Sequence, residues 1–218
     1  MTLLGLGLAL FGPFGLALAG ERRGGRPGLY ESLAGEAVYA AIVGAVLWIA
    51  VAHAGLSLET LGLRPLRWQS LAWGAALLVF FQRIYGPALF AVMRRLGVRG
   101  FEGGLAKMED LPLWYLTLAV VIGGSAEEIL YRGYAIAQLE QLGAASWLAA
   151  LLPLVVFAFA HVPLWGVAPA VSTFFAGGVF TLFYLWQRDL APNIIAHVAT
   201  DFVGIVLWTR ARSTQKAS

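Results

Sequence analysis

Residues 123–133 (GGSAEEILYRG) place two adjacent carboxylates and an arginine in a sequence that is otherwise rich in hydrocarbon side chains. An ionised carboxylate is costly inside a bilayer, so intramembrane acids are rare and usually functional. Glu128 and Arg132 are four residues apart, which puts them on one helix face in the order that favours an ion pair. Glu127 lies about 100° further round the helix. We therefore expect Arg132 to bind Glu128 and to leave Glu127 available for chemistry.

Two more polar groups occur at helical spacing inside apolar runs. Phe157 and His161 are four residues apart at the end of one run. Asn193, His197 and Asp201 form a stripe at i, i+4 and i+8 along another. Lipid offers no hydrogen bonds, so such a stripe must face the protein interior or water. Each group alone could be a structural hydrogen bond, but their joint occurrence on separate helices predicts one shared polar site.

A site made of these groups has the parts needed for hydrolysis. A glutamate held beside an imidazole in a dry cavity is a suitable general base for water. The oxyanion that forms at an attacked carbonyl needs fixed donors, which His197 and Asn193 could supply. Asp201 could donate only when protonated, or could orient His197 instead. The sequence contains no GxSxG or HExxH motif, which disfavours the corresponding serine and metal hydrolases.

The composition defines the class of protein that must position these residues. Of the 218 residues, 60% are hydrophobic and only 12% are charged, whereas soluble domains have roughly 25% charged residues. The chain is therefore expected to be an integral membrane protein. It has no cysteine, which excludes disulfides, thiolate metal sites and a cysteine nucleophile.

Apolar runs of about the length that spans a bilayer predict an all-α bundle. We expect one transmembrane domain over residues 1–218 with about seven helices, or eight if the fourth run breaks at Gly123 and Gly124. The runs cover residues 2–19, 37–54, 71–90, 111–130, 147–160, 168–186 and 190–208.

Basic residues are distributed unevenly among the loops. With seven spans, the positive-inside rule places the N-terminus outside and the C-terminus in the cytoplasm. One set of loops contains Arg22, Arg23, Arg26, Arg94, Arg95, Arg99, Lys107, Arg210, Arg212 and Lys216, and the opposite set contains Arg64, Arg67 and Arg188.

Three motifs in this order resemble the signature of the CPBP family, which includes the CAAX proteases and bacteriocin-processing enzymes and is also called the ABI family. The resemblance covers about residues 111–208, which we expect to be the catalytic core. The motifs are EExxxR at Glu127, Glu128 and Arg132, FxxxH at Phe157 and His161, and HxxxD at His197 and Asp201.

The resemblance implies an intramembrane glutamic endopeptidase with no obligatory metal and no cofactor. It implies that Glu127 activates water together with His161, while His197 and Asp201 line the oxyanion side. Glu128 and Arg132 would hold the site together, and Asn193 and Phe157 would support it. Asp201 departs from the Asn form of the last motif, because an aspartate donates a hydrogen bond only when protonated.

The resemblance also implies a membrane-anchored protein or peptide as substrate, membrane lipid as the surroundings, and no nucleic acid partner. We expect a multi-pass protein of the bacterial inner (plasma) membrane. In the predicted orientation the C-terminal end of the Glu127 run faces outward, which would suit C-terminal processing of exported, anchored proteins.

Three other classes remain open. They are a metal-dependent membrane hydrolase, a non-catalytic bacteriocin-immunity or scaffold protein, and a proton-coupled transporter. The sequence has no internal repeat, which disfavours the transporter.

Overall fold

The computed structural model describes residues 1–98 and 100–217, and this part of the chain contains helices and no strand. Arg99, and the side chains of Arg23 and Lys216, lie outside the described part. The all-α expectation is confirmed. Seven helical segments in the described ranges are long and apolar enough to cross a membrane.

Several of these segments consist of an α-helix continued by a π-helical or shorter helical piece. The fourth runs unbroken through Gly123 and Gly124, so this run forms one helix. The segments in chain order are α1 (Thr2–Arg23); α2 (Leu29–Ala52); α3 (Trp68–Phe80) with η1 (Phe81–Tyr85) and α4 (Gly86–Leu96); α6 (Leu113–Glu127) with η2 (Glu128–Ala135) and α7 (Ile136–Gln141); α8 (Ser146–Ala160) with α9 (Val162–Trp165); α10 (Val167–Gln187); and α11 (Ala191–Asp201) with η3 (Phe202–Leu207) and α12 (Trp208–Ala217).

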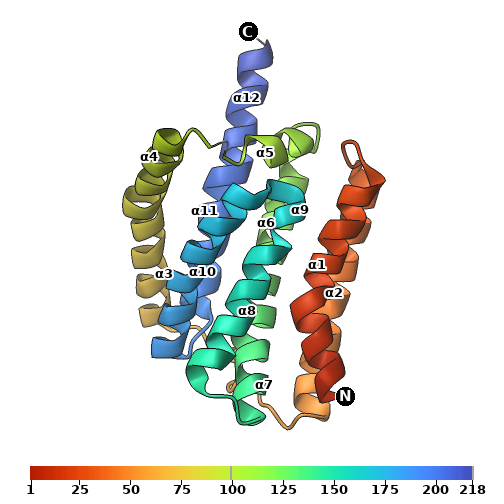
Figure 1. Ribbon diagram of the computed structural model, residues 1–218, viewed down its shortest axis with the longest axis vertical. Coiled ribbons are helices and arrows are strands. Elements are labelled where there is room, and N and C mark those ends of the chain that lie inside the picture. Colours follow the sequence, from red (N-terminus) through yellow and green to blue (C-terminus); the bar gives the residue numbers. More distant parts are fainter. Residues whose placement is uncertain (99, 218) are drawn as a thin grey trace.

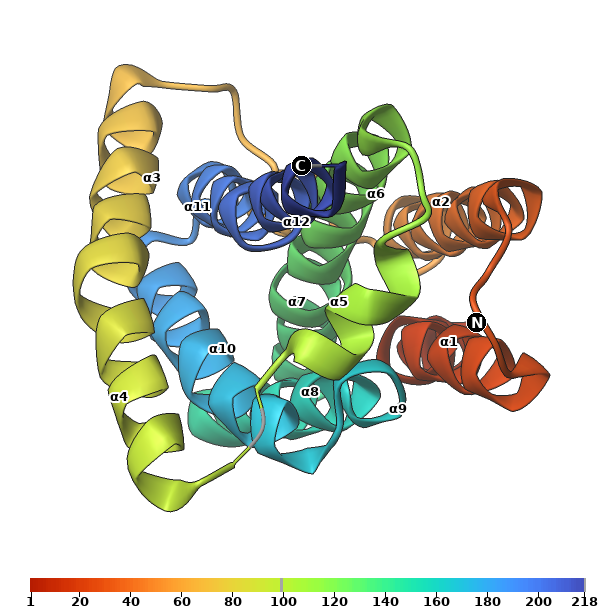
Figure 2. The same cartoon turned by 90° about the horizontal axis from the view of Figure 1, so that it is seen from above.

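The segment formed by α6, η2 and α7 occupies the middle of the bundle (Figure 1, Figure 2). The hairpin of α1 and α2 flanks it on one side, and α3 and α4 lie on the other. The helices α8, α10 and α11 lie between these two pairs and complete the bundle around the central segment. The largest core cluster forms where η2 meets the first hairpin: Leu130 and Tyr134 pack against Leu6, Ala9 and Val46. This packing fixes the segment that contains Glu127 and Glu128.

A short helix that the sequence patterns did not reveal, α5 (Glu102–Met108), lies across one end of the bundle (Figure 2). It packs on α9 through Gly104, where a Cβ atom would clash with the Trp165 ring. A glycine is therefore required at this contact.

The outer surface of the spans is apolar. Large hydrophobic side chains that would be costly in water are exposed along most of the bundle, as expected where lipid is the solvent. They include Phe11, Val51, Val79, Val121, Phe159, Phe175 and Leu182.

Of the three π-helical segments in residues 1–98 and 100–217, two begin directly after an acidic residue of the predicted site. η2 follows Glu127 and η3 follows Asp201. π-Helical turns are rare and concentrate at functional sites, because the wider turn redirects the side chains around it. Simple α-helical spacing did not indicate these segments.

Candidate active site

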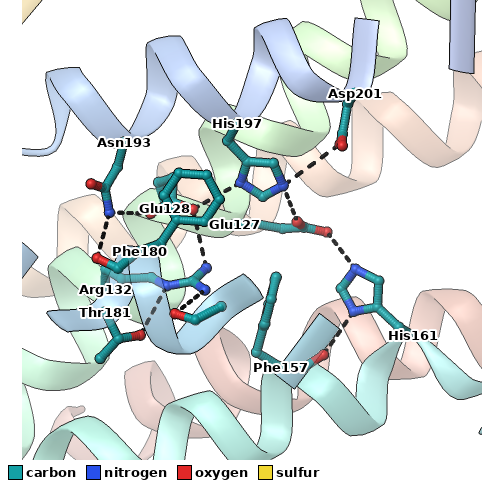
Figure 3. Close-up of polar contacts among 11 residues, drawn as sticks. Glu127, Glu128, Arg132, Phe157, His161, Phe180, Thr181, Asn193, His197 and Asp201 are labelled. Carbon is teal, nitrogen blue, oxygen red and sulfur yellow. Dashed lines mark hydrogen bonds and ion pairs between the residues drawn. The ribbon is translucent and has the colours of Figure 1, made fainter. Parts of the chain in front are cut away.

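Glu128 is the acceptor at the centre of a buried network (Figure 3). Its side chain is 0% exposed and accepts hydrogen bonds from three side chains. Arg132 Nη1 lies 3.1 Å from Oε1, His197 Nδ1 lies 2.8 Å from Oε1, and Asn193 Nδ2 lies 3.1 Å from Oε2. A buried carboxylate needs such compensation for its lost hydration. The predicted pairing of Glu128 with Arg132 is present.

Arg132 is itself almost fully enclosed by α8 and α10. Its Nη2 donates to the carbonyl of Gly177 at 3.3 Å, and its Nε donates to Thr181 Oγ1 at 3.4 Å. The guanidinium carbon lies 4.1 Å from the centre of the Phe157 ring, in cation–π geometry. A Cβ atom on Gly177 would lie 2.8 Å from Nη2, so this close approach requires glycine.

The imidazole of His197 is fixed from two directions. Glu128 can only accept, so Nδ1 of His197 is the donor, and Nε2 faces the other way. The ring stacks on Phe180, with centroids 5.3 Å apart and 21° between the planes. The carbonyl of Phe180 accepts a second hydrogen bond from Asn193 Nδ2 at 2.9 Å. Asn193 therefore uses its amide hydrogens within the network and directs neither toward Glu127.

Glu127 lies between the Nε2 atoms of two histidines (Figure 3). Its Oε1 is 3.9 Å from Nε2 of His161, and its Oε2 is 3.5 Å from Nε2 of His197. Asp201 Oδ2 approaches the same atom of His197 at 3.6 Å. The Glu127 side chain is 20% exposed, whereas Glu128 is not exposed at all. Glu127 can therefore be reached from the solvent, whereas the adjacent Glu128 is sealed inside the protein.

The tautomer of His161 follows from its partner. Nδ1 lies 2.8 Å from the backbone carbonyl of Phe157, which can only accept, so Nδ1 carries the hydrogen. In the neutral ring Nε2 then presents a lone pair toward Glu127. A carboxylate and an imidazole lone pair that face the same position can together bind one water molecule through both of its hydrogens.

These groups open into a chamber of about 650 Å³ between α1, α2, α6 and η3. Glu127, His161 and Asp201 line it, and so do Glu21 and Lys107 near the α1–α2 loop and α5. The chamber therefore runs from the acidic and imidazole groups toward the end of the bundle that α5 covers. Figure 1 shows α5 at that end of the bundle.

All eight residues singled out in the sequence meet in this region, and α10 adds partners that the sequence did not reveal. Gly177, Phe180 and Thr181 contact Arg132, Asn193 or His197, but they belong to an apolar helix with no charged residue and no helical stripe of polar groups. Within the described residues, no group of three or more His, Cys, Asp or Glu side chains is arranged to bind a metal ion.

The model of the type II CAAX prenyl endopeptidase Rce1-like family matches residues 109–203. This part of the chain is similar to the CAAX proteases. No curated protein and no solved structure gave a significant match.

The Rce1-like region begins just before α6 and ends at the first turn of η3, so it includes all eight residues singled out in the sequence. It supports an intramembrane endopeptidase in general, and the seven apolar helices make the chain a multi-pass integral membrane protein. The first hairpin, α1 and α2, lies outside the Rce1-like region but supplies one wall of its chamber.

Proposed function

We propose that the protein is a glutamic intramembrane endopeptidase in which Glu127 is the general base. The observation that supports this best is the position of Glu127 between two imidazoles whose Nδ1 atoms are already bonded elsewhere. Both Nε2 atoms are thereby directed at one carboxylate that faces the chamber. Such an arrangement has a defined proton acceptor, defined orienting groups and access for a peptide.

In the proposed reaction, a water molecule hydrogen-bonds to Glu127 and to the Nε2 lone pair of His161. Glu127 removes one proton as the water oxygen bonds to the carbonyl carbon of the substrate. The tetrahedral intermediate collapses when its carbon–nitrogen bond breaks. Glu127 returns the proton to the departing amine, so the products are a carboxylic acid and an amine.

The oxyanion of the intermediate needs a donor on the other side of the carbonyl. Nε2 of His197 faces both Glu127 and Asp201, which favours a proton on that atom. We assign this N–H as one oxyanion donor and Asp201 as a second group at the same position. Asn193, considered as a donor from the sequence, is committed to Glu128 and Phe180 instead and acts by holding the network.

The position of the chamber changes the expected side of cleavage. Glu127 is residue 15 of the 29-residue span Leu113–Gln141, and the chamber extends from it past Tyr115 and Leu111, toward the N-terminal end of that span. This end of the bundle also has the Arg- and Lys-rich loops, which the positive-inside rule assigns to the cytoplasm. We therefore propose access from the cytoplasmic side, instead of the outward side expected from the C-terminal end of this segment.

We propose as substrates membrane-anchored proteins or peptides that present an extended segment at the cytoplasmic face, in a bacterial plasma membrane. The chamber wall is mainly small and apolar, with Ala17, Gly20, Ala34, Gly35 and Gly123 among its lining residues. An extended peptide beside a lipid anchor would fit such a surface and would leave few polar groups without a partner.

The test is a comparison of protein termini in membranes that contain the wild-type protein or the Glu127→Gln variant. Glutamine keeps the size and hydrogen-bonding ability of the side chain but cannot act as a base. We expect a set of new termini that is absent with the variant, and equal yields of monodisperse protein after detergent extraction. Equal cleavage by the two proteins would overturn the proposal.

Two alternative functions, a metal-dependent hydrolase and a non-catalytic immunity protein, predict different results with the same membranes. Loss of cleavage on chelation, with recovery on adding zinc, would indicate a metal-dependent hydrolase. Bacteriocin protection that survives Glu127→Ala would indicate a non-catalytic immunity function.

A further inference from the structure

The wall of the chamber opposite α6 contains a carboxylate that the proposed reaction does not use. Glu36 lies on α2 and lines the chamber together with Tyr115 of α6. Its Oε1 accepts a hydrogen bond from the Tyr115 hydroxyl at 3.3 Å. Its Oε2 is buried and has no hydrogen-bond partner among the described residues. One turn further along α2, the buried hydroxyl of Tyr39 also lacks a partner there.

The charges that line the chamber are mostly negative. Five carboxylates are present, on Glu21, Glu31, Glu36, Glu127 and Asp201, and one ammonium group, on Lys107. The ammonium group is paired with Glu21 at 2.6 Å. Glu31 accepts the backbone N–H of Gly28 at 3.2 Å, and Asp201 lies beside His197. Of these five, Glu36 is the carboxylate that has no cationic or backbone N–H partner within the described part of the chain.

A half-satisfied carboxylate in a membrane span is expensive to maintain. A structural link to Tyr115 alone would not need a charge, because a neutral amide oxygen accepts the same hydrogen bond. A donor that arrives with the substrate would complete the hydrogen bonding of this carboxylate. A negative chamber favours a cation over a neutral amide for that position, and a charged donor makes the stronger bond to a carboxylate.

We propose that Glu36 binds a Lys or Arg side chain of the substrate close to the scissile bond. This inference rests on the proposed endopeptidase function and adds a specificity residue to it. The small side chains Ala34 and Gly35 beside Glu36 leave room for a long side chain along this wall. Because Glu36 lies on α2, outside the Rce1-like region, selectivity and chemistry are supplied by separate parts of the chain.

The inference is tested first by binding, which does not require cleavage. Fluorescent peptides that carry Lys, Arg, norleucine, Gln or Glu at one position at a time are titrated into the Glu127→Gln variant in lipid nanodiscs. We expect Lys and Arg peptides to bind at least about ten-fold more tightly than norleucine peptides at one position, the size typical of a charge-assisted hydrogen bond.

Adding Glu36→Gln should remove that preference while norleucine peptides bind as before. Adding Glu36→Lys should reverse it in favour of Glu peptides. The matched control is Glu31→Gln on the same helix, which should leave the preference intact because Glu31 already accepts the Gly28 N–H. Equal binding of Lys and norleucine peptides, no binding of any peptide, or a preference that persists after Glu36→Gln would each overturn the inference.

Cleavage by the wild-type protein is then measured on the same peptides. If basic peptides bind through Glu36 but are not hydrolysed, the specificity assignment holds and the endopeptidase proposal fails. If peptides are hydrolysed without a basic preference, the endopeptidase proposal holds and the Glu36 assignment fails.

Discussion

His197 and Glu128 are 69 residues apart in the chain and are joined by a hydrogen bond of 2.8 Å between Nδ1 and Oε1. This bond turns the opposite nitrogen of the imidazole toward Glu127. It thereby connects the sealed ion pair of Glu128 and Arg132 to the carboxylate that faces the chamber. The stability of the buried pair and the geometry of the proposed site are consequently properties of one network.

The first prediction concerns the charge balance of that network. Glu128→Gln keeps one acceptor oxygen, replaces the other with an NH2 donor, and leaves Arg132, whose side chain is 1% exposed, without its carboxylate. An uncompensated buried charge costs about 3–5 kcal/mol, so we expect the free energy of unfolding to fall by about that amount. Denaturant unfolding in detergent, followed by tryptophan fluorescence, measures it.

The control for this prediction is the Glu128→Gln/Arg132→Met double variant, which removes both charges. We expect it to be more stable than Glu128→Gln alone, with a coupling energy of about 1–3 kcal/mol. Simple additivity of the two single changes would show that the pair does not contribute as a unit.

A second prediction uses the adjacent glycines of α10 as a matched pair. In Gly177→Ala the new Cβ would lie 2.8 Å from Arg132 Nη2 and 2.9 Å from Leu154, inside the closed network. We expect a loss of about 1–3 kcal/mol, typical of overpacking, together with reduced cleavage. In Gly178→Ala the nearest neighbour would be 3.8 Å away, and both properties should stay close to wild type. Equal effects at the two positions would argue against the tight fit of Arg132.

The third prediction addresses the role of Asp201. If it donates a hydrogen bond to the oxyanion, an amide should serve at least as well, because it donates at every pH. We expect Asp201→Asn to retain cleavage and Asp201→Ala to lose about 10²-fold or more in kcat, as when an oxyanion donor is removed. Rates measured across pH provide the check: activity of the wild type should decline faster toward alkaline pH than that of D201N. If D201N is as inactive as the alanine variant, Asp201 acts through its charge on His197.

A fourth prediction tests how the far end of the bundle is fastened. Arg188 follows α10 and binds Glu140 of α7 through two hydrogen bonds of 2.8 Å, which raise the pKa of the guanidinium. Its backbone is left-handed, with φ of 49°, a conformation that costs non-glycine residues about 1–2 kcal/mol. Arg188→Ala should lower stability by about 1 kcal/mol, a modest effect because both side chains are partly exposed.

Arg188→Gly loses the same ion pair but relieves the left-handed backbone. We expect it to unfold at a higher temperature than Arg188→Ala, in a thermal scan of the two purified variants in the same detergent. The reverse order would mean that the backbone at this position is not under strain.

Local patterns were sufficient to predict the class of fold and which polar residues share a helix face. Hydrophobic length determines whether a helix can span a bilayer, so the seven spans follow from composition along the chain. Spacing of four residues determines which side chains share a helix face, so Glu128 with Arg132, and His197 with Asp201, could be paired in advance. These relationships depend only on neighbours in sequence.

Other features depend on contacts between segments that are distant in sequence, and the tertiary structure alone decided them. The π-helical turns after Glu127 and Asp201, the supporting groups of α10 and the approach of Glu36 to Tyr115 leave no periodic signal, because each results from packing between helices. The direction in which the chamber opens likewise depends on packing between helices that are distant in sequence. The sequence by itself determined that polar groups must meet inside an apolar bundle, since lipid cannot solvate them. Which carboxylate is sealed and which one meets the substrate was decided by how the helices pack.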